Sequence, residues 1–104
     1  MARRSTAYLI EYSPEAEDHL RYLTKDQQAR VLDAVDRQLA HQPTIETRNR
    51  KRMRPNTVAP WELRIAELRV YYDVEDEPRK SVKVMAVGKK DRNTVRIAGD
   101  IIEL

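Results

Sequence analysis

The chain contains no cysteine, only two glycines among its 104 residues and no long apolar run. The absence of cysteine excludes disulfide bonds, thiolate nucleophiles and cysteine-ligated zinc or iron–sulfur sites, and it is typical of a cytoplasmic protein. With so few glycines, the backbone has little means of cradling a phosphate as P-loops and dinucleotide-binding loops do. No apolar run reaches the roughly 18 residues that a membrane-spanning helix needs, so we expect no membrane contact.

Histidine and serine are also too scarce, or too badly placed, to form a familiar active site. His19 and His41 are the two histidines, and a separation of 22 positions is poor spacing for a metal site. The three serines lie near the N-terminus, before a proline and in a predicted turn. We therefore expect neither a metal nor a cofactor, and structural or merely solvated roles for both histidines.

Charge, by contrast, is abundant and unevenly distributed. Charged residues make up 36% of the chain, above the usual value of about 25%. Residues 1–47 hold 6 basic and 8 acidic side chains, whereas residues 48–104 hold 14 and 9, so the two parts carry −2 and +5. The length fits one domain over residues 1–104 with one modest core. A polyanionic partner for the basic part is therefore a serious hypothesis.

The basic excess is concentrated in one short run. Five cations occur within seven positions without an acidic residue between them: Arg48, Arg50, Lys51, Arg52 and Arg54. The segment from Pro43 to Pro60 shows no periodicity and contains three prolines, which predicts an extended loop. Two interpretations of the run stay open, namely contact with phosphate groups or a solvated basic loop.

The first part of the sequence predicts a strand followed by a helical hairpin. Residues 8–12 alternate like a short strand, and Ser13-Pro14 then caps and begins a first helix. Thr24 and Gln27 have the spacing of a capping box, which restarts the chain as a second, longer helix. The apolar stripe expected on that second helix consists of Val31, Leu32, Val35 and Leu39.

The second part predicts a small antiparallel sheet. The expected strands are residues 61–65, 68–74 and 81–87, the last ended by Gly88, followed by 95–98 and 101–104 as a closing hairpin or a strand and a tail. The order of elements implies an α+β domain in which the helical hairpin covers one face of the sheet. The other face is expected to stay open.

On that open face the sequence predicts a row of charged and aromatic side chains. Strand alternation places five of them there: Glu62, Arg64, Arg69, Tyr71 and Asp73. Such a surface suits cleavage of an RNA strand, because the 2′-OH of RNA is itself the nucleophile. The enzyme then needs cations that stabilise the phosphorane and one side chain that moves protons, but no metal or cofactor. For Arg64 and Arg69 taken alone, ordinary surface cations remain the alternative.

Four segments of the sequence together resemble one known family. They are residues 50–56 (Arg-Lys-Arg-Met-Arg-Pro-Asn), 59–65 (Ala-Pro-Trp-Glu-Leu-Arg-Ile), 68–74 (Leu-Arg-Val-Tyr-Tyr-Asp-Val) and 86–90 (Ala-Val-Gly-Lys-Lys). In this order they resemble the RelE/ParE superfamily of toxins from type II toxin–antitoxin systems. The resemblance implies a RelE-like fold, in which an N-terminal strand and a two-helix hairpin pack with a small antiparallel sheet of three to four further strands.

The resemblance also implies roles for individual residues. In the RelE branch, members cleave mRNA in the ribosomal A site with basic residues on the central strands. Arg64, Arg69 and Lys90 match such basic positions. The residues expected to contact RNA are Arg48, Arg50, Lys51, Arg52, Arg54, Lys89 and Arg92.

Three positions depart from the family pattern. Glu62 stands where the best-known members have a lysine, Lys90 where they have an arginine, and Arg96 where they have the catalytic tyrosine. Arg96 can stabilise charge but is a poor proton shuttle, because its pKa exceeds about 12. Glu62 or Tyr71 is then the candidate for proton transfer in a catalytic site that comprises Arg69, Arg64, Lys90, Arg96, Glu62 and Tyr71.

The resemblance finally implies partners and leaves three hypotheses of function. The partners are a cognate antitoxin protein, the ribosome with its mRNA, and operator DNA through the antitoxin complex. The chain is a ribosome-dependent mRNA endoribonuclease that inhibits translation, a ParE-like inhibitor of DNA gyrase, or a degenerate module that binds RNA or antitoxin without cleavage. The missing tyrosine favours the gyrase hypothesis, whereas the strand end at residues 86–90 and the basic run favour the nuclease.

Overall fold

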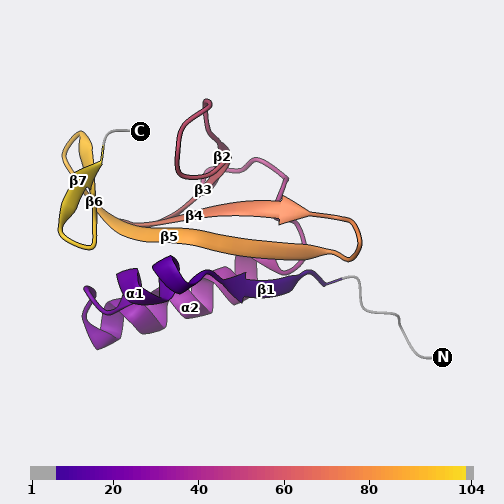
Figure 1. Cartoon of the computed structure of the whole chain (residues 1–104), viewed down its shortest axis with the longest axis horizontal. Coiled ribbons are helices and arrows are strands. Elements are labelled where there is room, and N and C mark those ends of the chain that lie inside the picture. The colour runs from indigo at the N-terminus through magenta and orange to yellow at the C-terminus, as the bar shows by residue number, and fades with distance from the viewer. Residues whose placement is uncertain (1–6, 103–104) are drawn as a thin grey trace.

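The computed structural model describes residues 7–102, in which a helical layer covers one face of a sheet (Figure 1). The elements are β1 (Leu9–Tyr12), α1 (Pro14–Leu20), α2 (Lys25–Leu39), β2 (Arg50–Arg52), β3 (Trp61–Ile65), β4 (Leu68–Glu75), β5 (Ser81–Asp91), β6 (Thr94–Ile97) and β7 (Asp100–Ile102). This arrangement confirms the predicted α+β fold. Neither helix of the described range is long and apolar enough to cross a membrane.

Strand β5 is the central strand of the sheet. It pairs antiparallel with β4 along one edge, and along the other it pairs in parallel with β1 and then antiparallel with β6. The remaining strands extend the sheet in the order β2-β3-β4-β5-β6-β7. This central place agrees with the strongly apolar sequence of residues 81–87, whereas the parallel direction of β1 does not follow from alternation in the sequence.

Both helices begin as the sequence predicts. Ser13 Oγ accepts a hydrogen bond of 3.0 Å from the backbone N–H of Ala16, and Pro14 is the first residue of α1. At the start of α2, the Gln27 N–H donates to Thr24 Oγ1 (3.1 Å) and Gln27 Oε1 accepts from the Thr24 N–H (3.0 Å). Because these caps satisfy N–H groups that have no partner within a helix, the chain can reverse between two short helices.

The main core lies between the helices and the sheet. Helix α2 buries Val31, Ala34, Val35 and Leu39. Leu32 is 43% exposed although the apolar pattern includes it, because a helix turns about 100° per residue and Val31 takes the inward direction. The sheet contributes Trp61, Leu63, Leu68, Val70, Tyr72, Val82, Val84 and Val87. Within this core the rings of Trp61 and Tyr72 stack with their centroids 6.1 Å apart.

Residues 50–52 form an edge strand, although the sequence predicts a loop from Pro43 to Pro60. They pair antiparallel with β3, and this pairing sets Lys51 directly opposite Glu62. A strand of three residues is too short to give a visible alternation, so its partner strand, rather than its own sequence, determines it. The middle of the basic run, residues 50–52, is therefore part of the sheet rather than of a loop.

Gly88 lies inside strand β5, although the sequence predicts that it ends the strand. A Cβ atom at this position would lie 2.6 Å from the carbonyl oxygen of Arg96 and 2.8 Å from a side-chain carbon of Ile97. Glycine is thus required because β6 crosses β5 at close range. The closing hairpin predicted from the sequence forms as β6 and β7, and residues 103 and 104 of its second strand lie outside the described residues.

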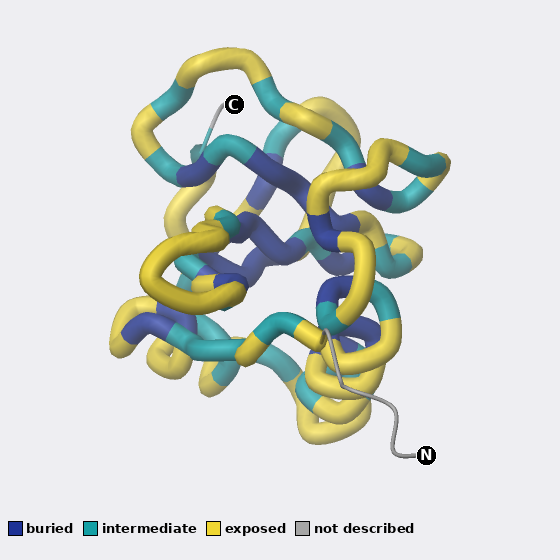
Figure 2. The backbone as a smooth tube through the Cα atoms, turned by 90° about the vertical axis from the view of Figure 1, so that its right-hand side faces the viewer, coloured by how far each residue is buried: buried dark blue, intermediate teal, exposed yellow. Residues whose placement is uncertain are grey.

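A second apolar cluster covers part of the sheet face that the sequence predicts to be open. It consists of Ala59, Tyr71, Ala86, Val95 and Ile97, with Met53, Val58, Met85 and Ile102 packed around it. The covering residues come from the loop between β2 and β3 and from the β6–β7 hairpin. Figure 2 shows buried backbone running through the middle of the molecule. The expectation of a fully open second face is therefore wrong.

Replacing Gly88 with alanine is expected to destabilise the domain by about 1–3 kcal/mol, the usual cost of forcing extra atoms into a packed site. The new methyl group would meet a backbone carbonyl, which cannot rotate away as a side chain can. Urea unfolding measures the change, with Lys83→Ala at an exposed position of β5 as the matched control. Equal unfolding midpoints for the two variants would contradict the close crossing of β6 over β5.

An ion pair between Arg30 of α2 and Glu67 in the β3–β4 turn makes stability depend on pH. Two hydrogen bonds of 3.2 Å join them, and the guanidinium lowers the pKa of the Glu67 carboxyl from 4.5 to about 2. Because the pKa in the folded state is the lower one, the pair stabilises the fold above the unfolded value, and this contribution is lost as the pH falls toward about 2. Solvent screening keeps the effect small.

We therefore expect Glu67→Gln to be less stable than the wild type at pH about 6, with the difference shrinking at pH about 2.5. Urea unfolding at the two pH values measures it. Asp33→Asn is the control, since it removes a carboxylate from a more exposed pair with Arg37. A difference that stays the same at both pH values would contradict the role of the ion pair.

Candidate nucleic-acid interface

Glu62 lies at the centre of the candidate site. In β3 it alternates with Trp61 and Leu63, which point into the helix-covered core, so its carboxylate points to the opposite face of the sheet. Its neighbours across the strands are Lys51 of β2 and Tyr71 of β4. Only 8% of the residue is exposed. A carboxylate so far removed from water has to be balanced by nearby cations.

Two arginines balance this carboxylate, as their predicted positions imply. Arg64 Nε donates a hydrogen bond of 2.8 Å to Glu62 Oε1, while Arg69 Nε lies 4.0 Å from Oε2. Arg69 Nη1 also donates to the backbone carbonyls of Ala66 (2.7 Å) and Leu68 (2.8 Å). The Arg69 side chain is 11% exposed, whereas that of Arg64 is 46% exposed. Arg64 is thus the more accessible of the two to a bound molecule.

Tyr71 is buried beneath Glu62, Arg64 and Arg69 and does not share their surface. The residue is 0% exposed, and within the described residues its hydroxyl faces the Glu62 carboxylate but forms no hydrogen bond of ordinary length. Burial, reinforced by the negative charge of Glu62, raises the pKa of the Tyr71 hydroxyl well above its usual value. The expectation of an exposed Tyr71 is therefore wrong. A phenol that is shielded from solvent and hard to ionise is unsuited to transfer protons at a bound substrate.

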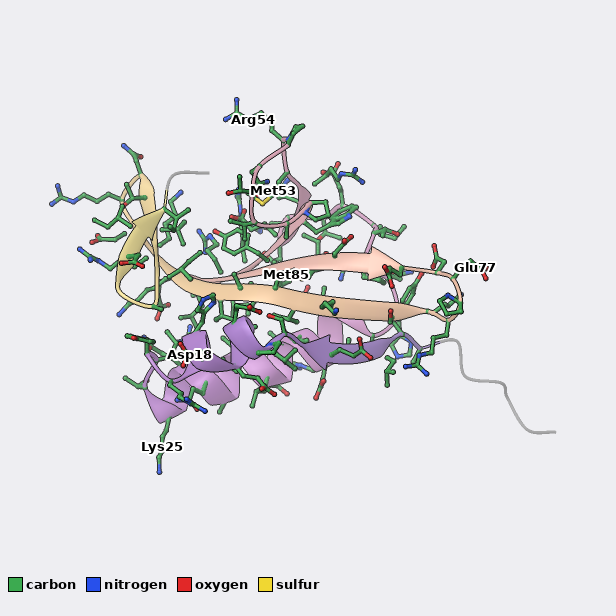
Figure 3. All side chains as sticks on the ribbon, in the orientation of Figure 1. Asp18, Lys25, Met53, Arg54, Glu77 and Met85 are labelled. Carbon is green, nitrogen blue, oxygen red and sulfur yellow. The ribbon has the colours of Figure 1, made fainter. Side chains whose placement is uncertain are left out.

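A cationic groove opens beside Glu62, between the sheet and the loop that follows β2. It has a volume of about 530 Å³, and its lining consists of Lys51, Arg52, Met53, Arg54, Pro55, Asn56, Glu62 and Arg64. Figure 3 shows Arg54 pointing outward from this loop, on the side of the sheet opposite the helices. The groove lining thus contains four cations and a single carboxylate, and such a concave positive surface attracts a phosphate chain.

The five cations of the basic run have different environments. Arg50 is 8% exposed, and its guanidinium donates to the backbone carbonyl oxygens of Ile45 (Nε, 2.9 Å) and Gln38 (Nη1, 2.9 Å). The prediction of Arg50 as an RNA contact is therefore wrong, because its donors are used inside the protein. The four others reach the surface: Arg48, Lys51, Arg52 and Arg54. Among these, Arg48 lies outside the groove lining.

Lys90 and Arg96, which the resemblance places in one catalytic site, point to opposite sides of the β5–β6 ribbon. Lys90 lies opposite Val95, whose side chain is buried in the second cluster, so Lys90 faces the side of the site. Arg96 follows Val95 in β6 and lies opposite Lys89, so its exposed side chain faces the other side. The structure thus brings Glu62, Arg64 and Arg69 together and does not bring Arg96 to them.

Comparison with known proteins bears on the architecture. The chain is similar to a chain in the crystal structure of the toxin–antitoxin complex RelBE2 from Mycobacterium tuberculosis, with a TM-score of 0.71 and 20% identity, over 86% of this chain and 98% of that one. The chain has a RelE-like fold. No family model and no curated protein matches the sequence. At this level of identity the likeness concerns the fold alone.

Asn56 holds the groove wall of this RelE-like domain in shape. Its Nδ2 donates to the carbonyl oxygens of Arg54 (2.7 Å) and Ala59 (2.9 Å), and its Oδ1 accepts from the N–H groups of Val58 (2.7 Å) and Ala59 (3.0 Å). Asparagine suits this place because its amide mimics a backbone turn. The Pro55-Asn56 pair is a turn signal that was visible in the sequence, although no structural role was predicted for it.

His19 joins helix α1 to strand β5. Its Nδ1 accepts a hydrogen bond of 3.2 Å from the backbone N–H of Val87, which fixes α1 against β5. Partial burial lowers the pKa of the imidazole, which favours the neutral ring that can accept this bond. The structural role expected for His19 is confirmed.

Replacing Tyr71 with phenylalanine is expected to leave the free energy of unfolding unchanged or to raise it by up to about 1 kcal/mol, because it removes a buried hydroxyl without a partner. Tyr72→Phe is the matched control on the same strand. The Tyr72 hydroxyl donates to the Pro43 carbonyl at 2.6 Å, so its removal should cost about 1 kcal/mol. Urea unfolding compares the two variants, and equal losses would contradict the unpartnered state of Tyr71.

Proposed function

We propose that this chain is the toxin of a type II toxin–antitoxin system and that it cleaves mRNA on the ribosome. The observation that carries the proposal is the groove whose lining combines four cationic side chains with the buried Glu62 carboxylate. The RelE-like fold and the four sequence segments that resemble RelE toxins support the same conclusion.

The position of Arg64 supports a role in binding the substrate. Its guanidinium already holds one carboxylate oxygen at 2.8 Å while 46% of its side chain remains exposed. A planar guanidinium has five N–H donors. Arg64 can therefore retain its hydrogen bond to Glu62 and still donate to a phosphate oxygen on the groove side. Lys51, Arg52 and Arg54 then provide further contacts along the phosphate chain.

The cleavage step can proceed with groups from the chain and the substrate. The 2′-OH attacks the neighbouring phosphorus and loses its proton, and the bond from phosphorus to the next 5′-oxygen breaks. A cyclic 2′,3′-phosphate and a 5′-OH end are left. Glu62 is the proton acceptor that the geometry favours, because Oε2 lies 4.0 Å from Arg69, too far to be hydrogen-bonded to it. Lys51, opposite Glu62 in the strand pair, is placed to protonate the leaving oxygen.

The alternatives to Glu62 are less well placed. Tyr71 is fully buried, and Arg96 is on the far side of the β5–β6 ribbon. Arg64 and Arg69 remain protonated and therefore stabilise charge instead of moving protons. Lys90 faces the side of the site and is exposed, so it adds positive charge near the reacting phosphate.

The cationic groove also defines the partner that would silence the toxin. A cognate antitoxin is expected to lay acidic side chains over the groove and so to compete with phosphate for Arg64 and its neighbours. The similar structure comes from a toxin–antitoxin complex, which supports a partner of this kind. Contact with operator DNA would be made through that antitoxin.

A second candidate function is binding without cleavage, either to RNA or, as in ParE-like proteins, to DNA gyrase. It is favoured by one observation, namely that Glu62 is paired with Arg64 and that Arg69 is tied to two backbone carbonyls. In this alternative the three residues stabilise the sheet and present charge, and the chain carries no proton acceptor for catalysis.

Primer extension on mRNA from cells that express the chain without antitoxin tests the proposal. The wild type should produce new 5′ ends within coding sequences. Glu62→Gln should reduce them by about 100-fold or more, because glutamine keeps the shape and the acceptor for Arg64 but does not take up a proton. Glu67→Gln is the matched control, since it makes the same chemical change at the β3–β4 turn and should cleave like the wild type.

The other outcomes separate the hypotheses. Full cleavage by Glu62→Gln would show that the carboxylate is structural and would remove it from the mechanism. Growth arrest by the wild type with no new 5′ ends would contradict the nuclease. A supercoiling assay with purified gyrase then tells inhibition of gyrase from RNA binding.

A further inference from the structure

The hairpin of β5 and β6 carries a second group of cations on the side turned away from the Glu62 groove. Lys89 lies directly opposite Arg96, and both residues are exposed. Side chains at such cross-strand positions share one face of the sheet, and like charges there are destabilising. The pairing therefore costs stability unless an anion neutralises it.

The turn between the two strands adds a third cation. Arg92 is exposed and has a φ of 62°, a left-handed conformation that glycine or asparagine adopts at lower cost. Asp91 is the acidic residue of the same segment. Within residues 7–102, no carboxylate lies within ion-pair distance of Lys89, Arg92 or Arg96. Their charges are thus available to a partner.

The chemistry of this surface differs from that of the groove. Residues 89–96 contain no aromatic side chain, so the bases of a single strand have nothing to stack on. The groove, in contrast, is concave, and Met53, Pro55 and Asn56 line it beside its charged residues. Exposed cations without aromatic neighbours suit the sugar–phosphate backbone of a double helix, whose bases are already paired.

We infer that Lys89, Arg92 and Arg96, here named the hairpin cations, bind the backbone of a double-helical RNA segment. This inference rests on the proposed ribosomal function and adds a second contact to it: the groove holds the single-stranded substrate while the hairpin cations hold structured RNA. Because Lys89 and Arg96 face away from the site, both contacts can be occupied at once. Arg96 then binds RNA instead of taking part in the cleavage step.

The double variant Lys89→Ala/Arg96→Ala tests this contact. Binding of the full chain to an RNA duplex of about 20 base pairs is measured between about 50 and 200 mM salt. The slope of log affinity against log salt should become shallower by about 2, because two phosphate contacts are lost and each contributes about 0.9. A single-stranded RNA of about eight nucleotides, bound through the groove, should keep its affinity.

Two further variants serve as controls. Lys25→Ala/Arg37→Ala removes one lysine and one arginine from exposed positions of α2 and should leave the slope unchanged. Lys89→Arg/Arg96→Lys keeps both charges and should also retain the wild-type slope. A loss in the alanine variant with retention in this one assigns the effect to charge rather than to misfolding.

Three results would overturn the inference: an unchanged slope in the alanine variant, an equal loss of affinity for the single strand, or tighter binding of a DNA duplex than of the RNA duplex. Failure of the proposed function gives a different pattern. If the wild type does not cleave mRNA but the slope still falls, the duplex contact stands without the nuclease. If it cleaves mRNA and the slope is unchanged, the nuclease stands without the duplex contact.

Discussion

Burial of strand β4 from both sides is the constraint on which the rest of this small domain depends. Tyr71 and Tyr72 are adjacent, point to opposite faces and are both 0% exposed. The helices cover the Tyr72 face, and the loop after β2 with the β6–β7 hairpin covers the Tyr71 face. A chain of which 40% is hydrophobic therefore builds two apolar clusters around one strand, and its many charges are left to the rims.

The candidate site lies where this second covering stops. Met53 and Val58 of the loop pack into the Tyr71 cluster, while their neighbours Arg52 and Arg54 line the groove. The wall that carries the cations is thus fixed by the same contacts that complete the fold. A wall with a fixed backbone matters for charge stabilisation, because less of the chain has to reorder when a phosphate arrives.

The sequence predicts those features that local chemistry determines. The caps at Ser13 and Thr24 and the alternation in residues 61–65 give the helices and the β3 strand correctly, because each depends on neighbours within a few positions. The burial of Tyr71 and the crossing at Gly88 depend on segments far away in the chain, so alternation assigned Tyr71 to an open face. The joining of Glu62, Arg64 and Arg69 was predictable from their shared face, whereas the outward direction of Arg96 required the register of β6.

Arg50 and Lys51 show that a run of cations is not a set of equivalent charges. The two residues are adjacent, but β2 turns Arg50 inward and Lys51 toward the groove. The forked guanidinium of Arg50 donates to the carbonyls of Gln38 and Ile45 together and so links the end of α2 to the segment before β2. The side chain of Arg50 thus stabilises the fold, and that of Lys51 lines the groove. Selection on the two positions should therefore act through different properties, geometry at residue 50 and charge at residue 51.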